Sequence, residues 1–212
     1  MVIVAGYSDV GYEKFTGCRF KDAEFSISWA RLLAASGLVA ITYTNREPAA
    51  DLQTLVRHVR GNAASLGIDP DRIGIWASSG NAPLALSLLM QAGTDFLKCA
   101  VLCYAFTLDL DGSTAIAEAA ATWKFANPGV GRSLADLPQD LPLFIARAGR
   151  DEFPGLNGAL DRFAAHALAR NLPLTFVNHP TGPHAFDLVD DSDTSREIVR
   201  QILAFARYHL LR

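Results

Sequence analysis

Short apolar runs alternate with longer helical patterns along the whole chain. This alternation is typical of a parallel sheet whose strands are joined by crossover helices. The strand candidates, nearly continuous in apolar character, are residues 2–5, 38–43, 72–77, 99–105, 142–148 and 173–178. The helix candidates are residues 24–36, 49–66, 82–91, 113–125, 156–170 and 193–211. Because continuous apolar strands are covered on both faces, we predict an α/β domain with about six mostly parallel strands between helices.

One connection is much longer than the others. Between two predicted strands the chain runs from residue 105 to residue 141, through an alanine-rich helix and an Asn-Pro-Gly turn. Long excursions within a compact domain are usually functional. We therefore predict a single domain over residues 1–212, with 105–141 as a candidate lid or cap. Trp123 and Phe125 in this excursion could shape an apolar pocket, although an ordinary helix packed on the sheet explains them equally well.

Charge and cysteine content limit the partners and the compartment. The 19 basic and 22 acidic residues form no basic patch, which argues against nucleic acid or an anionic membrane as a partner. The three cysteines have no paired spacing, so we expect neither disulfides nor a zinc site. The chain opens on an apolar run without a basic leader, and no stretch has the length of a membrane span. We expect a cytoplasmic protein.

The most informative segment is a pair of serines between a predicted strand and a predicted helix. A serine on such a turn is held clear of the sheet, beside the positive end of the helix. The turn needs small residues two positions before and two after the nucleophile. Ser78 would place Trp76 at the first of these positions, whereas Ser79 places Ala77 and Asn81 there. Ser79 is therefore the predicted nucleophile, and the alternative is a serine pair that caps the helix.

Two segments carry a resemblance to a known family. The run RIGIWASSGN at residues 72–81 resembles the strand-to-elbow segment of the α/β-hydrolase fold, in its dienelactone hydrolase-like branch. The run GPHAF at residues 182–186 resembles the histidine loop of the same proteins. The family pattern is Gly-x-nucleophile-x-Gly, and Ala77 and Asn81 stand here in place of the two glycines. Dienelactone hydrolases proper use cysteine, so a serine at position 79 does not imply the dienelactone reaction.

The resemblance implies a catalytic triad in the order nucleophile, acid, histidine. Asp151 and His184 each follow a predicted strand, at the sheet edge where parallel sheets place their sites. An imidazole is needed to take the proton of a serine hydroxyl, and a carboxylate orients that imidazole. We assign these roles to Ser79, His184 and Asp151, and expect their side chains to converge with contacts of about 3 Å.

Several other polar residues compete for these roles or have structural explanations. Asp109, after the strand at 99–105, is a second candidate for the acid, and His179 is the competitor of His184. We expect Glu152 to face solvent. The other histidines are expected to have surface or helix-end roles: His58, His166 and His209. An acidic cluster is expected to cap the last helix rather than to bind metal: Asp187, Asp190, Asp191 and Asp193.

An oxyanion hole requires two N–H donors aimed at the developing negative charge. One should be the backbone amide of Gly80, directly after the nucleophile. By resemblance, the other should be the amide of Tyr7, since Ala5-Gly6-Tyr7 stands where relatives carry His-Gly-x. The same loop lacks the glycine spacing of a dinucleotide fingerprint. We expect no metal and no organic cofactor.

These residues predict a serine hydrolase that cleaves a small carboxylic ester, lactone or thioester through an acyl-enzyme. The alternative is a non-catalytic protein of the same fold that binds a ligand or a partner, which the departures at Ala5, Ala77 and Asn81 would suit. Relatives usually carry two further strands before the first one here. An abbreviated sheet, or a start upstream of this sequence, would explain the difference. An exposed sheet edge needs cover, and a homodimer is one candidate for it.

Overall fold

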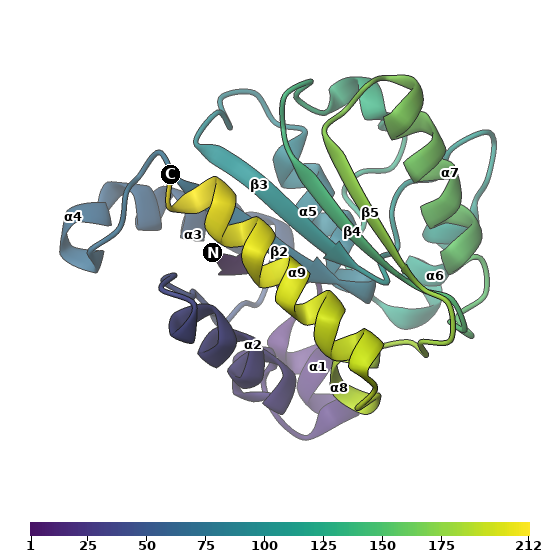
Figure 1. Cartoon of the computed structure of the whole chain (residues 1–212), viewed down its shortest axis with the longest axis horizontal. Helices are drawn as coiled ribbons and strands as arrows, with labels where there is room; N and C mark the ends of the chain where they lie inside the picture. The colour runs from purple at the N-terminus through teal and green to yellow at the C-terminus, as the bar shows by residue number, and fades with distance from the viewer.

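The computed structural model describes residues 1–212 and contains one fully parallel sheet. Its spatial order is the order of the chain, β1-β2-β3-β4-β5. The strands are β1 (Val2–Ile3), β2 (Ile73–Ser78), β3 (Leu97–Cys103), β4 (Leu143–Ala148) and β5 (Leu174–His179). Helices cover the sheet on both faces (Figure 1), and the chain has the predicted α/β architecture.

The predicted strand at 38–43 is not a full strand, so the sheet has five strands rather than six. Only Ile41 pairs with β1, through hydrogen bonds of 2.9 Å from Ile3 N–H to Ile41 O and from Ile41 N–H to Met1 O. Two residues further on, the amide of Ala5 donates to the Tyr43 hydroxyl at 3.2 Å instead of to a backbone carbonyl. A side chain thus replaces the next rung of the ladder, and the pairing ends.

Helices of four or more residues alternate with the strands, as the sequence predicts. Their bounds are α1 Asp9–Thr16, α2 Glu24–Ala35, α3 Pro48–Gly61, α4 Ala63–Leu66, α5 Ala82–Leu89, α6 Ala115–Trp123, α7 Leu156–Ala169, α8 Phe186–Val189 and α9 Asp193–Leu210. The predicted helix at 49–66 is divided into α3 and α4, because Asn62 caps the end of α3 with a side-chain bond to His58 O. The short helices α1 and α8 were not among the predicted elements.

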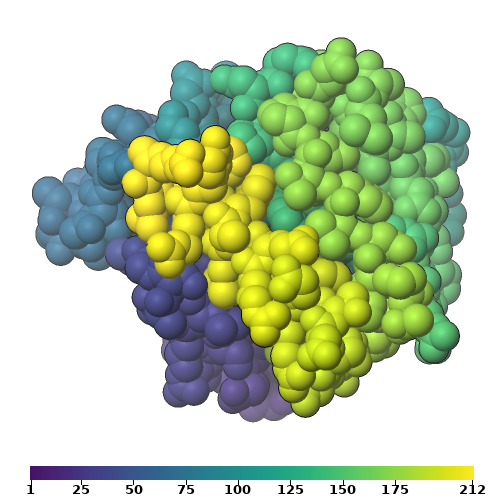
Figure 2. All heavy atoms as spheres, viewed as in Figure 1, coloured from purple at the N-terminus to yellow at the C-terminus, as the bar shows by residue number.

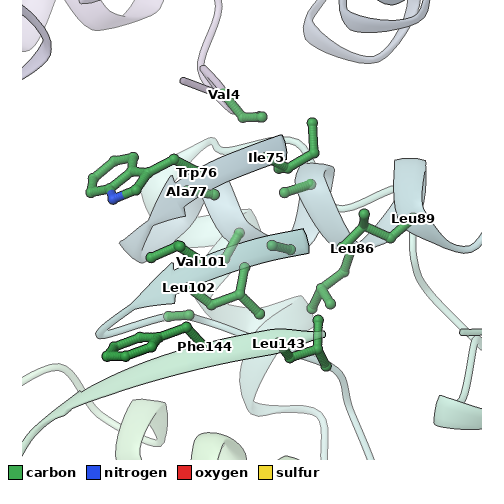
Figure 3. Close-up of a cluster of buried hydrophobic side chains, with 14 of the residues drawn as sticks. Val4, Ile75, Trp76, Ala77, Leu86, Leu89, Val101, Leu102, Leu143 and Phe144 are labelled. Carbon is green, nitrogen blue, oxygen red and sulfur yellow. The ribbon is translucent and has the colours of Figure 1, made fainter. Parts of the chain in front are cut away.

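Side chains of alternate strand residues fill two separate layers of the core. Trp76 of β2 and Phe144 of β4 point to one side in Figure 3, where Trp76 meets Trp29 of α2 at 4.9 Å between ring centroids. Phe144 meets Phe205 of α9 at 5.4 Å on that same side. Ile75 and Leu143 point to the opposite side, toward α5. Each strand is therefore apolar on both faces, which explains its continuous hydrophobic run.

The last helix joins distant parts of the chain. α9 runs across the front of the sheet in Figure 1 and contacts four of the five strands, β2 to β5. In Figure 2 the yellow C-terminal segment lies between the purple N-terminal segment and the green segment that contains α7. Its buried side chains recur at helical spacing: Ser195, Ile198, Ile202, Ala206 and Leu210. None of the helices combines the length and apolar character that crossing a membrane requires.

The excursion between β3 and β4 is firmly attached to the rest of the domain. Its helix α6 packs against α7. Phe125, just beyond α6, is buried and stacks on Phe106 at 5.1 Å between ring centroids. The next residue, Ala126, donates its N–H to Gly6 O at 2.8 Å. Trp123, at the end of α6, remains 43% exposed. The excursion therefore buries one large aromatic side chain and leaves another partly exposed at the surface.

Candidate active site

The two adjacent serines have different conformations. Ser78 is the last residue of β2, with an extended φ of −128° and an exposed fraction of only 3%. Ser79 has a φ of +48°, in the left-handed region that non-glycine residues seldom adopt. Such strain is concentrated at functional sites and is typical of a nucleophile elbow. The Ser79 hydroxyl is not hydrogen bonded to any group of the chain.

Behind this elbow the backbone approaches a neighbouring loop too closely for side chains. A Cβ on Gly80 would lie 2.5 Å from the Tyr7 hydroxyl and 2.6 Å from the Phe125 ring. A Cβ on Gly6 would lie 2.6 Å from Gly80 O. Position 6 therefore requires glycine, because the atoms that a Cβ would meet there belong to the backbone, whereas a side chain at position 80 would force Tyr7 and Phe125 to move. The contact places the loop after β1 directly against the turn that carries Ser79.

His184 and Asp151 form a close pair at the carboxyl edge of the sheet. His184 Nδ1 lies 2.6 Å from Asp151 Oδ2, and the Asp151 side chain is 0% exposed. The other Asp151 oxygen, Oδ1, accepts the N–H of Phe153 at 3.0 Å. Aromatic rings hold the imidazole from two sides, Tyr104 at 4.8 Å and Phe153 at 4.4 Å between centroids. Asp151 can therefore fix the tautomer and the orientation of the ring, and Nε2 remains without a partner in the chain.

Ser79 and His184 line the same cavity, whose volume is about 340 Å³. No hydrogen bond joins the Ser79 hydroxyl to the imidazole, so only one of the two expected contacts of the triad is formed. Bonds between nucleophile and base are often long before substrate binds and shorten in the complex. The structure thus brings Asp151 and His184 into contact and places Ser79 on the wall that His184 shares.

The cavity wall is mostly apolar and carries no Lys, Arg, Asp or Glu. Its aromatic members are Tyr7, Tyr12, Phe15, Phe20, Phe25, Tyr104 and Trp123. Tyr7 and Trp123 are among the residues that the sequence interpretation named, and the others, most of them from the segment around α1, are not. The signal that could have found them is the recurrence of aromatic residues in this otherwise polar stretch. Burial raises the pKa of Tyr7 to about 12.

The loop after β1 has a free backbone amide at a residue that lines this cavity. The Gly6 N–H donates to Asn81 Oδ1 at 2.7 Å, and the Gly6 carbonyl accepts from Ala126. Tyr7 lines the cavity, and its N–H has no acceptor among the groups of the chain. The Tyr7 amide is therefore available to a ligand, whereas the amide of Gly6 is not.

The expectation that the whole acidic cluster caps the last helix is wrong for Asp187. It does not cap the last helix; it accepts hydrogen bonds from Tyr104 Oη at 2.7 Å and Trp29 Nε1 at 2.6 Å. Burial raises the pKa of the Asp187 carboxyl, an effect that these two bonds and the charge of His184 partly offset. Tyr104 itself has a φ of +36° directly after β3. Asp187 thus fixes the tyrosine whose ring packs against His184.

The rest of the acidic cluster lies at the start of α9, as expected, but the N-cap is Ser192. Asp190 accepts from the hydroxyls of Ser192 and Ser195 and contacts His179 Nε2 at 3.0 Å. Asp191 and Asp193 both pair with a single arginine of α9, Arg196. His179 is therefore occupied by its contacts with Asp190 and Ser195, and it does not line the cavity that Ser79 lines.

The other competing residues also have structural partners. Asp109 accepts the N–H groups of Ile116 and Ala117 at the start of α6, at 2.8 and 2.9 Å, and is not the partner of His184. Glu152 is exposed, as expected. The remaining histidines lie on helices: His58, His166 and His209. No group of three or more His, Cys, Asp or Glu side chains is arranged to hold a metal ion.

Comparison with solved structures identifies the fold. An α/β-hydrolase enzyme, MGS-M1, from a Medee basin deep-sea metagenome library matches over 100% of this chain and 84% of its own, with a TM-score of 0.70 and 20% identity. An esterase from Pyrobaculum calidifontis matches 98% of this chain and 75% of its own, with a TM-score of 0.68 and 20% identity. A bacterial heroin esterase matches 99% of this chain and 73% of its own, with a TM-score of 0.66 and 18% identity.

The chain therefore has the α/β-hydrolase fold. No protein-family profile and no curated protein matches the sequence. At identities of 20% or below, the structural likeness defines the fold, and the chemistry has to be argued from the site itself.

Proposed function

We propose that this protein is a serine hydrolase that cleaves a small carboxylic ester, lactone or thioester through an acyl-enzyme. The observation that carries the proposal is the arrangement around one cavity. A fully buried carboxylate, Asp151, holds Nδ1 of His184, whose free Nε2 shares the cavity with the strained, unpaired Ser79. These are the three groups that an activated serine nucleophile requires.

In the proposed reaction, the Ser79 oxygen attacks the substrate carbonyl carbon and His184 Nε2 takes the hydroxyl proton. The carbonyl oxygen becomes an oxyanion that accepts hydrogen bonds from the amides of Tyr7 and Gly80. Collapse of this intermediate breaks the bond to the alcohol or thiol, which leaves with the proton from His184. Water then attacks the acyl-enzyme in the same way, with His184 as base, and releases the acid and free Ser79.

The cavity favours an uncharged substrate with an apolar group. Its volume of about 340 Å³ suits a small molecule, and its wall carries aromatic rings without a charged Lys, Arg, Asp or Glu. A charged acyl or alcohol group would lose hydration there without gaining an ionic partner. The structural neighbours that are esterases support ester cleavage.

The test is hydrolysis of a panel of short activated esters, lactones and thioesters by the wild type and by Ser79→Ala. We expect the substitution to lower kcat/KM by roughly 10³-fold or more, because members of a triad act as a unit. Ser65→Ala is the matched control, since this exposed serine bonds only to a local carbonyl, that of Asn62, and does not line the cavity.

Two results would contradict the proposal in different ways. If Ser79→Ala keeps most of the activity while Ser78→Ala loses it, the nucleophile has been assigned to the wrong serine. If the folded wild type hydrolyses no member of the panel, the fold instead serves as a binding protein.

A further inference from the structure

Asn81 occupies the position where the nucleophile-elbow pattern has glycine, and its side chain makes a hydrogen bond that glycine could not make. The residue is only 5% exposed. Its Oδ1 accepts the backbone N–H of Gly6 at 2.7 Å, across 75 residues of sequence. A glycine at this position could not make this bond, because it has no side-chain acceptor. The departure from the pattern therefore adds a specific link between the elbow and the loop after β1.

This link completes the anchoring of the loop. The amide of Ala5 donates to the Tyr43 hydroxyl at 3.2 Å, and the carbonyl of Gly6 accepts from Ala126 at 2.8 Å. With the Gly6 amide held by Asn81, the first backbone donor of the loop that is left free is the N–H of Tyr7. Asn81 thus occupies the Gly6 N–H, which would otherwise compete with the Tyr7 N–H for a ligand. The same bond holds Gly6, the residue directly before Tyr7, in place.

Steric contact fixes the distance between the two elements. A Cβ on Gly6 would meet Gly80 O at 2.6 Å and Asn81 Cα at 2.8 Å, so the backbones of loop and elbow already touch. Contact alone sets how close the loop comes but not how its peptide plane is rotated. A hydrogen bond of 2.7 Å to one side-chain oxygen does set that rotation, because such bonds are directional.

We infer that Asn81 is a positioning residue of the oxyanion hole, which orients the Tyr7 N–H through its bond to Gly6. The inference rests on the proposed function, because it assigns Tyr7 to the stabilisation of the oxyanion. Asn81 acts on the transition state and not on the bound substrate, since the negative charge that Tyr7 would meet develops only during the reaction.

The experiment compares Asn81→Ala with the wild type in ester hydrolysis and in amide hydrogen exchange. Removing one oxyanion donor costs about 10² to 10³ in kcat, and a misoriented donor should cost somewhat less, roughly 10- to 100-fold. KM should change by less than about twofold, because the ground state does not use the bond. The Gly6 amide should exchange at least about tenfold faster, since it loses its acceptor. Asn81→Asp keeps an oxygen at this place and should keep the Gly6 amide protected.

Asn45→Ala is the matched control. Asn45 is 3% exposed, and neither polar atom of its side-chain amide has a hydrogen-bond partner. Its removal deletes the same group from an equally buried site without touching the Gly6 amide, so kcat and Gly6 exchange should both stay at wild-type values.

The outcomes separate the two proposals. If the wild type is active but Asn81→Ala has an unchanged kcat, the role of Asn81 is overturned and the proposed function is not. The same holds if Asn45→Ala loses as much kcat as Asn81→Ala. A fall in activity caused only by a raised KM also overturns it. A wild type without esterase activity overturns the proposed function and the inference with it. Slow exchange of Gly6 in Asn81→Ala would show that the bond does not hold the loop.

Discussion

Two His–Asp pairs lie at the end of β5, and only one of them faces the cavity. His184 Nδ1 lies 2.6 Å from Asp151, and its side chain is 21% exposed. His179 Nε2 lies 3.0 Å from Asp190, and its side chain is 1% exposed. The residue types and the distances are similar, but the surroundings are not.

The difference lies in which ring nitrogen is free and what it meets. His184 uses Nδ1 for its carboxylate and leaves Nε2 without a partner beside the cavity. His179 uses Nε2 for Asp190 and for the hydroxyl of Ser195, and its Nδ1 is buried without any partner. A proton can therefore be exchanged with a ligand at His184 but not at His179. Access and orientation, and not the pairing itself, distinguish a candidate base from a structural histidine.

Replacement of each histidine by alanine should separate these roles, and it gives the largest expected effect. His184→Ala should lower kcat/KM by roughly 10³-fold or more while stability changes little, because its partners are Asp151 and two rings at a cavity wall. His179→Ala should leave kcat per folded molecule within several-fold. It should destabilise the fold by about 1–3 kcal/mol, because it removes a buried side chain together with its hydrogen bond to Asp190.

Initial rates and urea unfolding of the two variants check this expectation. The comparison fails if His179→Ala abolishes activity while its unfolding free energy is unchanged, since His179 would then be the base.

A third carboxylate between the two histidine pairs sharpens the comparison. Asp187 accepts from Tyr104 Oη on Oδ1 and from Trp29 Nε1 on Oδ2. An asparagine has a single acceptor oxygen, so it can keep one of these bonds and turns an N–H group toward the other donor. Asp187→Asn should therefore lower the free energy of unfolding by about 1–3 kcal/mol. Asp191→Asn, at an exposed ion pair, is the control and should change it by less than about 1 kcal/mol. Equal stability of the two variants in urea unfolding would contradict a structural role for Asp187.

The smallest expected effect concerns acid stability at the His179–Asp190 pair, whose carboxylate is partly exposed. Hydrogen bonds from Ser192 and Ser195 lower the pKa of Asp190 from 3.8 to about 2. A carboxyl whose pKa is lower in the folded state stabilises the fold above its unfolded value and loses that contribution as pH falls toward 2. Between pH 4 and 2 the melting temperature of the wild type should therefore fall more steeply than that of Asp190→Asn. Parallel melting profiles of the two proteins would count against this interpretation.

Most of the sheet could be predicted because its strands are apolar on both faces. The boundaries could not, since they depend on contacts between distant residues. β3 begins at Leu97, which pairs with Ile73, although the exposed Lys98 makes this part of the sequence look like a loop. It ends at Cys103 because Tyr104 turns into the left-handed region. α1 was not predicted because it contains Gly11, a poor helix former, and its residues show little apolar periodicity, despite the Ser8 cap.

In the candidate site, local chemistry was predictable and cross-chain contacts were not. The small neighbours of Ser79 and the order Ser79, Asp151, His184 are visible in the sequence. The bond from Gly6 to Asn81 joins segments 75 residues apart, and that from Tyr104 to Asp187 joins segments 83 apart. Asparagine or aspartate at such positions has several common uses in turns and caps, so the residue type alone does not choose among them. Packing of the fold selects the partner.

The most direct test of the central claim is reaction of the wild type with a fluorophosphonate, followed by peptide mass spectrometry. An activated serine attacks the phosphorus and displaces fluoride, so the account predicts one phosphonyl adduct, on Ser79, that is lost in Ser79→Ala and strongly reduced in His184→Ala. A folded protein that stays unlabelled, or one that carries the adduct on Ser78, would contradict it.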